Sequence, residues 1–286
     1  MNERTLSYDK LIIPEVKYLA MSNSKIAYRE MGEGEVIYML PSWPANSIEY
    51  IPLMNLLSKK YHCIAIDFPY WTGYSTTTKK RLSIEDYVDI ASEFFTSKIN
   101  SKANLIGYSF SVPVATLLKI KYEKQINKVI LVSGFFNGKG IRDRHPILLH
   151  VYKLIRAFTP EFLVSYIVRK ILFNTYKETV YYKEYKDTPL FVGFFKMIED
   201  LEFKKALNSI LDVIDKDYTN QFLQAYEQSL PLLIWAEKDP DFIIQAMGNL
   251  DDMLCSEDHT LRLTDHNHLT FDVFKSAKYI EAFLSK

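Results

Sequence analysis

The sequence has no excess of charge of either sign, because 35 Lys and Arg residues balance 35 Asp and Glu residues. Proteins that bind nucleic acid usually carry a clear basic excess, so nucleic acid is not expected as a partner. Only two cysteines are present, Cys63 and Cys255, which excludes a fold built on a disulfide framework. Cys63 stands in an apolar run and is interpreted as a buried small residue.

Long apolar runs are also missing. The longest stretch without a charged residue, 103–118, has about 16 residues, whereas a bilayer span needs roughly 20, and it contains Gly107 and Pro113. The first residues show no charged segment followed by an apolar one, as a secretory signal would. We therefore expect no integral membrane segment and a cytoplasmic location.

What the sequence does contain is an alternation of short apolar runs with segments of helical spacing. The expected strands are residues 16–21, 25–31, 36–40, 62–66, 104–108, 129–132, 231–235 and 260–264. The expected helices are residues 47–60, 83–98, 110–124, 242–254 and 272–285, the second of them opening on a capping box of Ser83 and Asp86. Between residues 134 and 218 only helical signals occur.

This order predicts an α/β protein with a mostly parallel central sheet and helices on both faces. The core is expected to comprise residues 1–134 and 219–286, and residues 135–218 are expected to form a helical lid inserted into it. Ligands of such sheets bind beyond the carboxyl ends of the strands. Functional side chains are therefore sought directly after each strand.

The strongest such motif is Gly107-Tyr108-Ser109-Phe110-Ser111, at the junction of an expected strand and an expected helix. A nucleophile elbow lifts one serine above the sheet on a sharp turn, and small residues must stand two positions away on either side. Gly107 meets that need, and Ser111 stands where glycine is usual. Ser109 is therefore the candidate nucleophile.

Two later strand ends supply an acid and a base. Asp239 follows the 231–235 strand and is chosen as the acid, with Asp241 as the alternative. His268 follows the 260–264 strand and is preferred to His266 because it lies next to the last helix. A metal bound by His266 and His268 has little support, because the spacing offers no third ligand. The chain order serine, acid, histidine is that of a hydrolase triad on this type of sheet.

With these motifs the chain resembles the lidded α/β-hydrolase fold family of esterases and thioesterases. The resemblance covers about residues 16–285 and includes the segments 40–43 and 67–75, the Ser109 elbow, Asp239 and His268. Asp67 is interpreted as structural. The dehalogenases and epoxide hydrolases of the family use Asp as the nucleophile, and Ser109 argues against both.

The chain departs from the family at Pro41-Ser42, where relatives usually carry His-Gly. The resemblance implies that the oxyanion hole is formed by the backbone N–H groups of Trp43 and Phe110, which do not depend on side-chain identity. Trp43 and Tyr108 are further expected to contact substrate. No metal or organic cofactor is implied.

These residues predict a serine hydrolase acting on a carboxylic ester or thioester through an acyl-enzyme on Ser109. The alternatives are an acyltransferase or lyase using the same triad, and a binding protein of the same fold without activity. Residues 139–187 hold ten Lys and Arg against five Asp and Glu, an excess of five. This segment is interpreted as a lid with a solvated basic face, or as a basic rim suited to a carrier-bound or phosphate-bearing acyl substrate.

Overall fold

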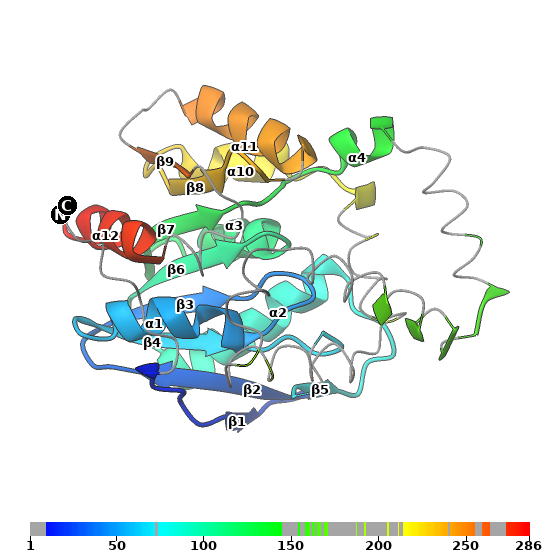
Figure 1. The fold of residues 1–286 in the computed structure, drawn as a ribbon, viewed down its shortest axis with the longest axis horizontal. Helices are drawn as coiled ribbons and strands as arrows, with labels where there is room; N and C mark the ends of the chain where they lie inside the picture. The colour runs from blue at the N-terminus through cyan, green and yellow to red at the C-terminus, as the bar shows by residue number, and fades with distance from the viewer. Residues whose placement is uncertain are drawn as a thin grey trace.

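The structure of the chain is a computed structural model. It describes residues 10–71, 74–144, 214–239, 241–254, 259–263 and 273–286, together with isolated positions between 154 and 211. The described strands form one nine-stranded sheet in the order β1-β2-β4-β3-β6-β7-β8-β9, with β5 paired to β2 (Figure 1). They are β1 (Lys17–Ala20), β2 (Ser24–Met31), β3 (Glu35–Leu40), β4 (Tyr61–Ile66), β5 (Thr76–Thr77), β6 (Ala103–Tyr108), β7 (Ile126–Val132), β8 (Leu232–Ala236) and β9 (Thr260–Leu263).

Six strands run parallel, and one edge of the sheet is antiparallel. Strands β4, β3, β6, β7, β8 and β9 pair in parallel, whereas β2 is antiparallel to β1, β4 and β5. The carboxyl ends of the parallel strands therefore meet along a single edge. The prediction of a mostly parallel sheet is confirmed.

Helices cover both faces of this sheet (Figure 1). One face packs against α1 (Ile51–Leu57) and α12 (Val273–Leu284), and the other against α2 (Ile84–Phe94), α3 (Ser111–Lys121), α10 (Thr219–Tyr226) and α11 (Asp241–Leu254). Strand β3 shows why its sequence is a continuous apolar run. Ile37 and Met39 join the core on the α1 face, whereas Tyr38 and Leu40 join the core on the α2 face.

The structure divides two of the expected helices. Residues 47–60 form a 3₁₀ turn (Ser47–Tyr50), followed by α1, in which Pro52 occupies the first turn. Residues 83–98 form α2 and then a π-helical turn (Phe95–Ile99), which ends where Asn100 adopts a φ of 43°. Helix α3 ends at Lys121, and two elements, β5 and α10, were not expected from the sequence.

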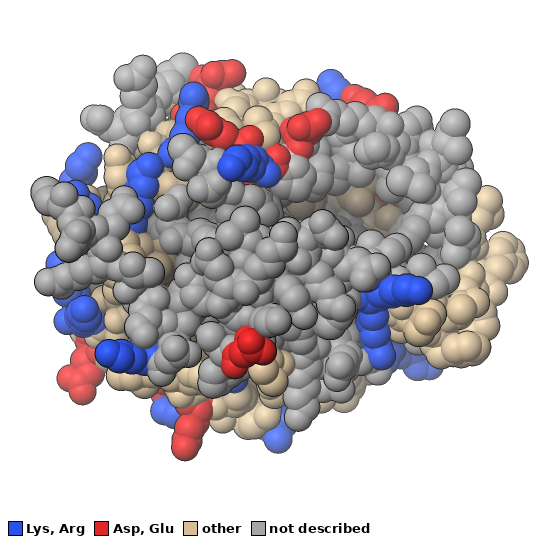
Figure 2. All heavy atoms as spheres, in the orientation of Figure 1, with Lys and Arg blue, Asp and Glu red and all other residues tan. Residues whose placement is uncertain are grey.

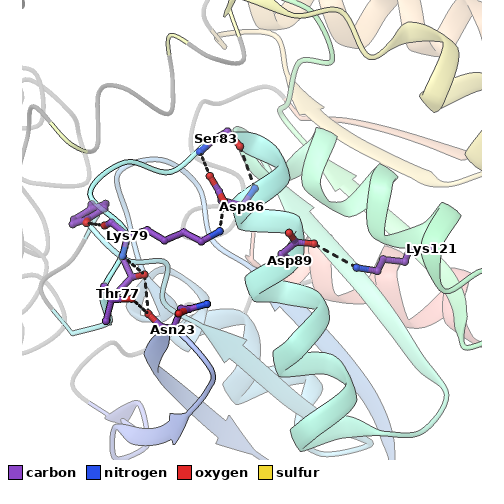
Figure 3. A network of polar contacts seen from close by, with 9 residues as sticks. Asn23, Thr77, Lys79, Ser83, Asp86, Asp89 and Lys121 are labelled. Carbon is purple, nitrogen blue, oxygen red and sulfur yellow. Dashed lines mark hydrogen bonds and ion pairs between the residues drawn. The ribbon is translucent and has the colours of Figure 1, made fainter.

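The start of α2 is fixed by the predicted capping box, which Figure 3 shows beside β5. The Ser83 hydroxyl accepts a hydrogen bond from the Asp86 backbone N–H at 3.2 Å, and the Asp86 carboxylate accepts one from the Ser83 N–H at 2.8 Å. Lys79 forms an ion pair with the same carboxylate. Thr77 of β5 donates to the carbonyl of Asn23 at 3.0 Å, so the network joins α2 to the edge of the sheet.

Most of the segment 135–218 lies outside the described residues, which here are 135–144 with helix α4 (Lys139–Arg144), 214–218 and the isolated positions. The lid therefore stays a prediction. Within the described part of the chain, no helix is long and apolar enough to cross a bilayer. Described basic and acidic side chains are interspersed on the face that Figure 2 shows, in keeping with the balanced charge of the sequence.

Candidate functional site

The turn between β6 and α3 has the backbone geometry of a nucleophile elbow. Ser109 occupies this turn with a φ of 53°, a left-handed conformation that non-glycine residues adopt only when the surroundings impose it. Gly107 lies so close to α3 that an added Cβ would stand 2.6 Å from the Cβ of Ala115. At Gly134, which follows β7, an added Cβ would stand 2.0 Å from a methyl group of Val112. Both glycines let the strands approach the helix that carries the elbow.

The residue after Ser109 is anchored by an aromatic cluster. The Phe110 side chain is fully buried, and its ring packs against Trp71 and Tyr87 at centroid distances of 4.8 and 5.6 Å. Trp71 donates a hydrogen bond to the Tyr87 hydroxyl at 3.0 Å. These contacts fix the backbone of Phe110, the expected oxyanion donor, at the start of α3. The amino end of this helix also favours negative charge beside Ser109.

Hydrogen bonds link the ends of β6, β7 and β8. The Ser109 N–H donates to the carbonyl of Val132, the last residue of β7, at 2.8 Å. Ser133, which follows Val132, donates from its N–H to the carbonyl of Ile234 in β8 at 2.8 Å. The Ser133 hydroxyl then donates to the Asp239 carboxylate at 2.6 Å. Ser109 and Asp239 therefore lie at the same edge of the sheet, two strands apart, with the end of β7 joining them.

Asp239 and Asp241 differ in their surroundings. Asp239 is buried, with 4% of its surface exposed, and the Ala236 N–H donates to its carboxylate at 2.9 Å. Asp241 begins α11 and is exposed. A fixed, enclosed carboxylate suits the orientation of a histidine better than a solvated one. His268 and His266 both lie outside the described residues, so their places in the site stay predictions.

The segment 41–43, where the chain departs from the family, is held from three sides. The Ser111 hydroxyl donates to the carbonyl of Pro41. Glu49 accepts two hydrogen bonds from Ser42, one from the backbone N–H and one from the hydroxyl, each at 2.6 Å. The Ala45 N–H donates to the carbonyl of Ser42 at 2.9 Å. The serine that replaces glycine is thus built into the loop by a specific acceptor.

A second carboxylate lies near this loop. Asp67, at the end of β4, is fully buried, and its Oδ1 accepts a hydrogen bond from the Ser47 N–H at 2.8 Å. Arg29 donates to the Ser47 hydroxyl at 2.7 Å. Burial raises the pKa of Asp67 to about 6, and the hydrogen bonds from Ser47 and the charge of Arg29 oppose that rise. These contacts are those of a structural residue, as the sequence indicates.

Burial also perturbs the carboxyl group of Glu49. Burial raises its pKa to about 8, hydrogen bonds from Ser42 oppose the rise, and the negative charge of Asp67 adds to it. Two carboxylates therefore share the space behind the 41–43 segment, and both are more easily protonated than in water.

The expected substrate contacts occupy different surroundings. Trp43 is half-buried and packs against the core on the α2 face. Tyr108, the last residue of β6, is half-buried and packs against the core on the α1 face. Sequence reasoning missed three contributors: Ser133, Glu49 and the hydroxyl of Ser111. The Ser-Gly pair directly after a buried strand was the one available signal for Ser133.

Comparison with known proteins agrees with the fold. Residues 35–169 match the family described as alpha/beta hydrolase fold. Over 121 residues the chain is 27% identical to an (E)-2-((N-methylformamido)methylene)succinate hydrolase of Acinetobacter baylyi, a match that covers 42% of this chain and 46% of that enzyme. The matched segment thus spans less than half of the length of that relative.

Solved structures match nearly the whole chain at low identity. An enol-lactonase from Burkholderia xenovorans has a TM-score of 0.70 and 17% identity, covering 94% of this chain and all of the other. An epoxide hydrolase variant from Solanum tuberosum has a TM-score of 0.73 and 14% identity, covering 96% and 99%. At this identity the likeness shows the fold alone. Residues 35–169 thus match the α/β-hydrolase fold family in sequence, and the described residues have the fold of that family.

Proposed function

We propose that this protein is a serine hydrolase that cleaves a carboxylic ester or thioester through an acyl-enzyme on Ser109. The observation that carries the proposal is the left-handed backbone of Ser109 at the β6–α3 turn, with Gly107 and Gly134 packed against it. Such a turn costs backbone strain, and strained turns of this kind are found where a side chain must be presented for function. An enol-lactonase and an epoxide hydrolase share the fold, so the fold by itself does not decide the reaction. The proposal therefore depends on the identity of the nucleophile.

In this proposal Ser109 attacks the acyl carbon while His268 accepts its proton. Asp239, held by Ser133 and Ala236, orients His268 and stabilises its cation. The backbone N–H groups of Trp43 and Phe110 bind the oxyanion. His268 then returns the proton to the leaving group and activates the water that releases the acid.

A fluorophosphonate probe tests the proposal, because it phosphonylates only a serine that a base has activated. The intact mass of wild type should increase by one probe, whereas Ser109→Ala and His268→Ala should stay unlabelled. Ser101→Ala, which changes an exposed serine ahead of β6, is the matched control and should label like wild type. Labelling that survives in Ser109→Ala would contradict the assignment of the nucleophile.

Product analysis then separates hydrolysis from acyl transfer. With a p-nitrophenyl ester in water, the proposal predicts one equivalent of free acid for each nitrophenol released. An acyltransferase using the same triad would instead release the acid slowly and accelerate when an alcohol or thiol acceptor is added.

A further inference from the structure

The residues behind the 41–43 segment form a hydrogen-bonded support whose side chains take no direct part in the proposed reaction. The Pro41–Ser42 peptide is held at both ends: its carbonyl accepts from the Ser111 hydroxyl, and its N–H donates to Glu49. Because a peptide unit is planar, two opposed hydrogen bonds fix the orientation of its plane.

The next peptide unit is held through its carbonyl. The carbonyl of Ser42 accepts the Ala45 N–H at 2.9 Å, and in a trans peptide the N–H of Trp43 points away from that carbonyl. The direction of the Trp43 N–H therefore follows from that of the Ser42 carbonyl. Glu49 contributes to this direction because its two hydrogen bonds hold the N–H and the side chain of Ser42. Ser111 adds a direct tie to the elbow, since it lies two residues after Ser109.

We infer that Glu49 is a positioning residue for the oxyanion hole. By binding Ser42 it keeps the Trp43 N–H in place relative to the Ser109 elbow. The inference rests on the proposed function. It also gives a reason for both departures from the family pattern, because each serine that replaces a glycine contributes its hydroxyl to the support: Ser42 to Glu49, and Ser111 to Pro41.

Glu49 itself is placed by the fold rather than by a flexible loop. It lies in the 3₁₀ turn that precedes α1, where Asn46 caps the turn by accepting the Ile48 N–H at 2.8 Å. The following residue, Tyr50, is fully buried and donates from its hydroxyl to the Leu40 carbonyl at 2.6 Å. The acceptor thus stands on a turn bound to the end of β3, the strand that delivers the 41–43 segment.

The chain offers a matched control. Glu93 of α2 accepts the same pair of hydrogen bonds, from the Ser22 N–H at 2.6 Å and the Ser22 hydroxyl at 2.8 Å, at an exposed site beside the β1–β2 turn. Glu49→Ala and Glu93→Ala each remove one carboxylate that binds one serine, and only the first lies at the proposed oxyanion hole.

The test is steady-state hydrolysis of p-nitrophenyl butyrate, with kcat calculated per site titrated by fluorophosphonate. Oxyanion contacts act in the transition state, so Glu49→Ala should lower kcat by about 10- to 100-fold and leave KM within about threefold of wild type. Glu49→Gln keeps an acceptor for the Ser42 N–H and should recover most of the rate. Glu93→Ala should retain the wild-type kcat.

A Glu49→Ala enzyme with wild-type kcat per titrated site would overturn the inference while leaving the proposed function intact. So would equal losses of kcat in Glu49→Ala and Glu93→Ala, because they would show a general effect on folding. If Glu49→Ala does not fold, Ser42→Ala removes one of the two hydrogen bonds and must itself lower kcat. A wild type that neither labels nor hydrolyses ester would contradict the proposed function and the inference with it.

Discussion

Replacing Asp67 by Asn should make the stability of the protein less sensitive to a rise in pH from 4.5 to 8, because the buried carboxylate is costly once it ionises. Its Oδ1 accepts the Ser47 N–H, but its Oδ2 is buried and has no hydrogen-bond partner among the described residues. Burial raises the pKa from 3.8 to about 6. A folded-state pKa above the unfolded one means that the folded protein holds the proton more tightly, so stability is lost as pH rises through the folded pKa.

The size of the effect follows from that difference in pKa. At 1.36 kcal/mol for each pKa unit, the Asp67 carboxylate costs wild type about 2 kcal/mol of unfolding free energy between pH 4.5 and pH 8. Asn keeps an acceptor for Ser47 and removes the charge. It also removes one cause of the raised pKa of Glu49, which acts in the same direction.

Urea unfolding followed by tryptophan fluorescence at pH 4.5, 6 and 8 measures the predicted effect. The difference in unfolding free energy between Asp67→Asn and wild type should grow in favour of the variant as pH rises. Asp67→Ala, which also removes the acceptor for the Ser47 N–H, should be less stable than Asp67→Asn at each pH. Parallel pH profiles for wild type and Asp67→Asn would refute the reasoning.

Three further predictions concern single residues. Gly107→Ala should cost about 1–3 kcal/mol of unfolding free energy in urea and reduce probe labelling, because the added methyl would meet α3, whereas Gly248→Ala meets nothing within 4 Å and should unfold no more easily than wild type. Ser133→Ala should lower the unfolding free energy by about 1–3 kcal/mol and lower kcat, because Asp239 loses a donor; an unchanged kcat would count against its role. Burial raises the pKa of Cys63 to about 12, so Cys63→Ala should show the wild-type thiol titre with Ellman's reagent in the native state and one thiol fewer after unfolding.

The core strands were predictable because parallel strands buried on both faces leave short, continuous apolar runs. Ile37 and Tyr38 are adjacent in sequence and buried on opposite sides of the sheet, which is the arrangement that such a run indicates. Strand β5 has two residues and leaves no pattern to recognise. Helix α10 contributes only Phe222 and Tyr226 to the core, too few to mark it within a polar segment.

The sequence indicates a candidate site only where a motif is local. The Ser109 elbow is readable because its glycine and its serine lie within a few residues of each other. Ser133 and Asp239 are separated by 106 positions, and no local pattern around Ser133 indicates that Asp239 accepts its hydrogen bond. Glu49 lies in a segment of helical spacing whose polar residues are ordinarily solvated. Its contact with Ser42 depends on how the turn before α1 folds back toward β3.

The most direct test of the account is to locate the acyl group itself. Wild type mixed with excess p-nitrophenyl butyrate and quenched in acid within the first turnovers should carry one butyryl group. Tandem mass spectrometry should place that group on Ser109 in the tryptic peptide 103–119. A butyryl group on Ser111 or on another peptide, or steady hydrolysis without any acylated serine, would contradict the central claim.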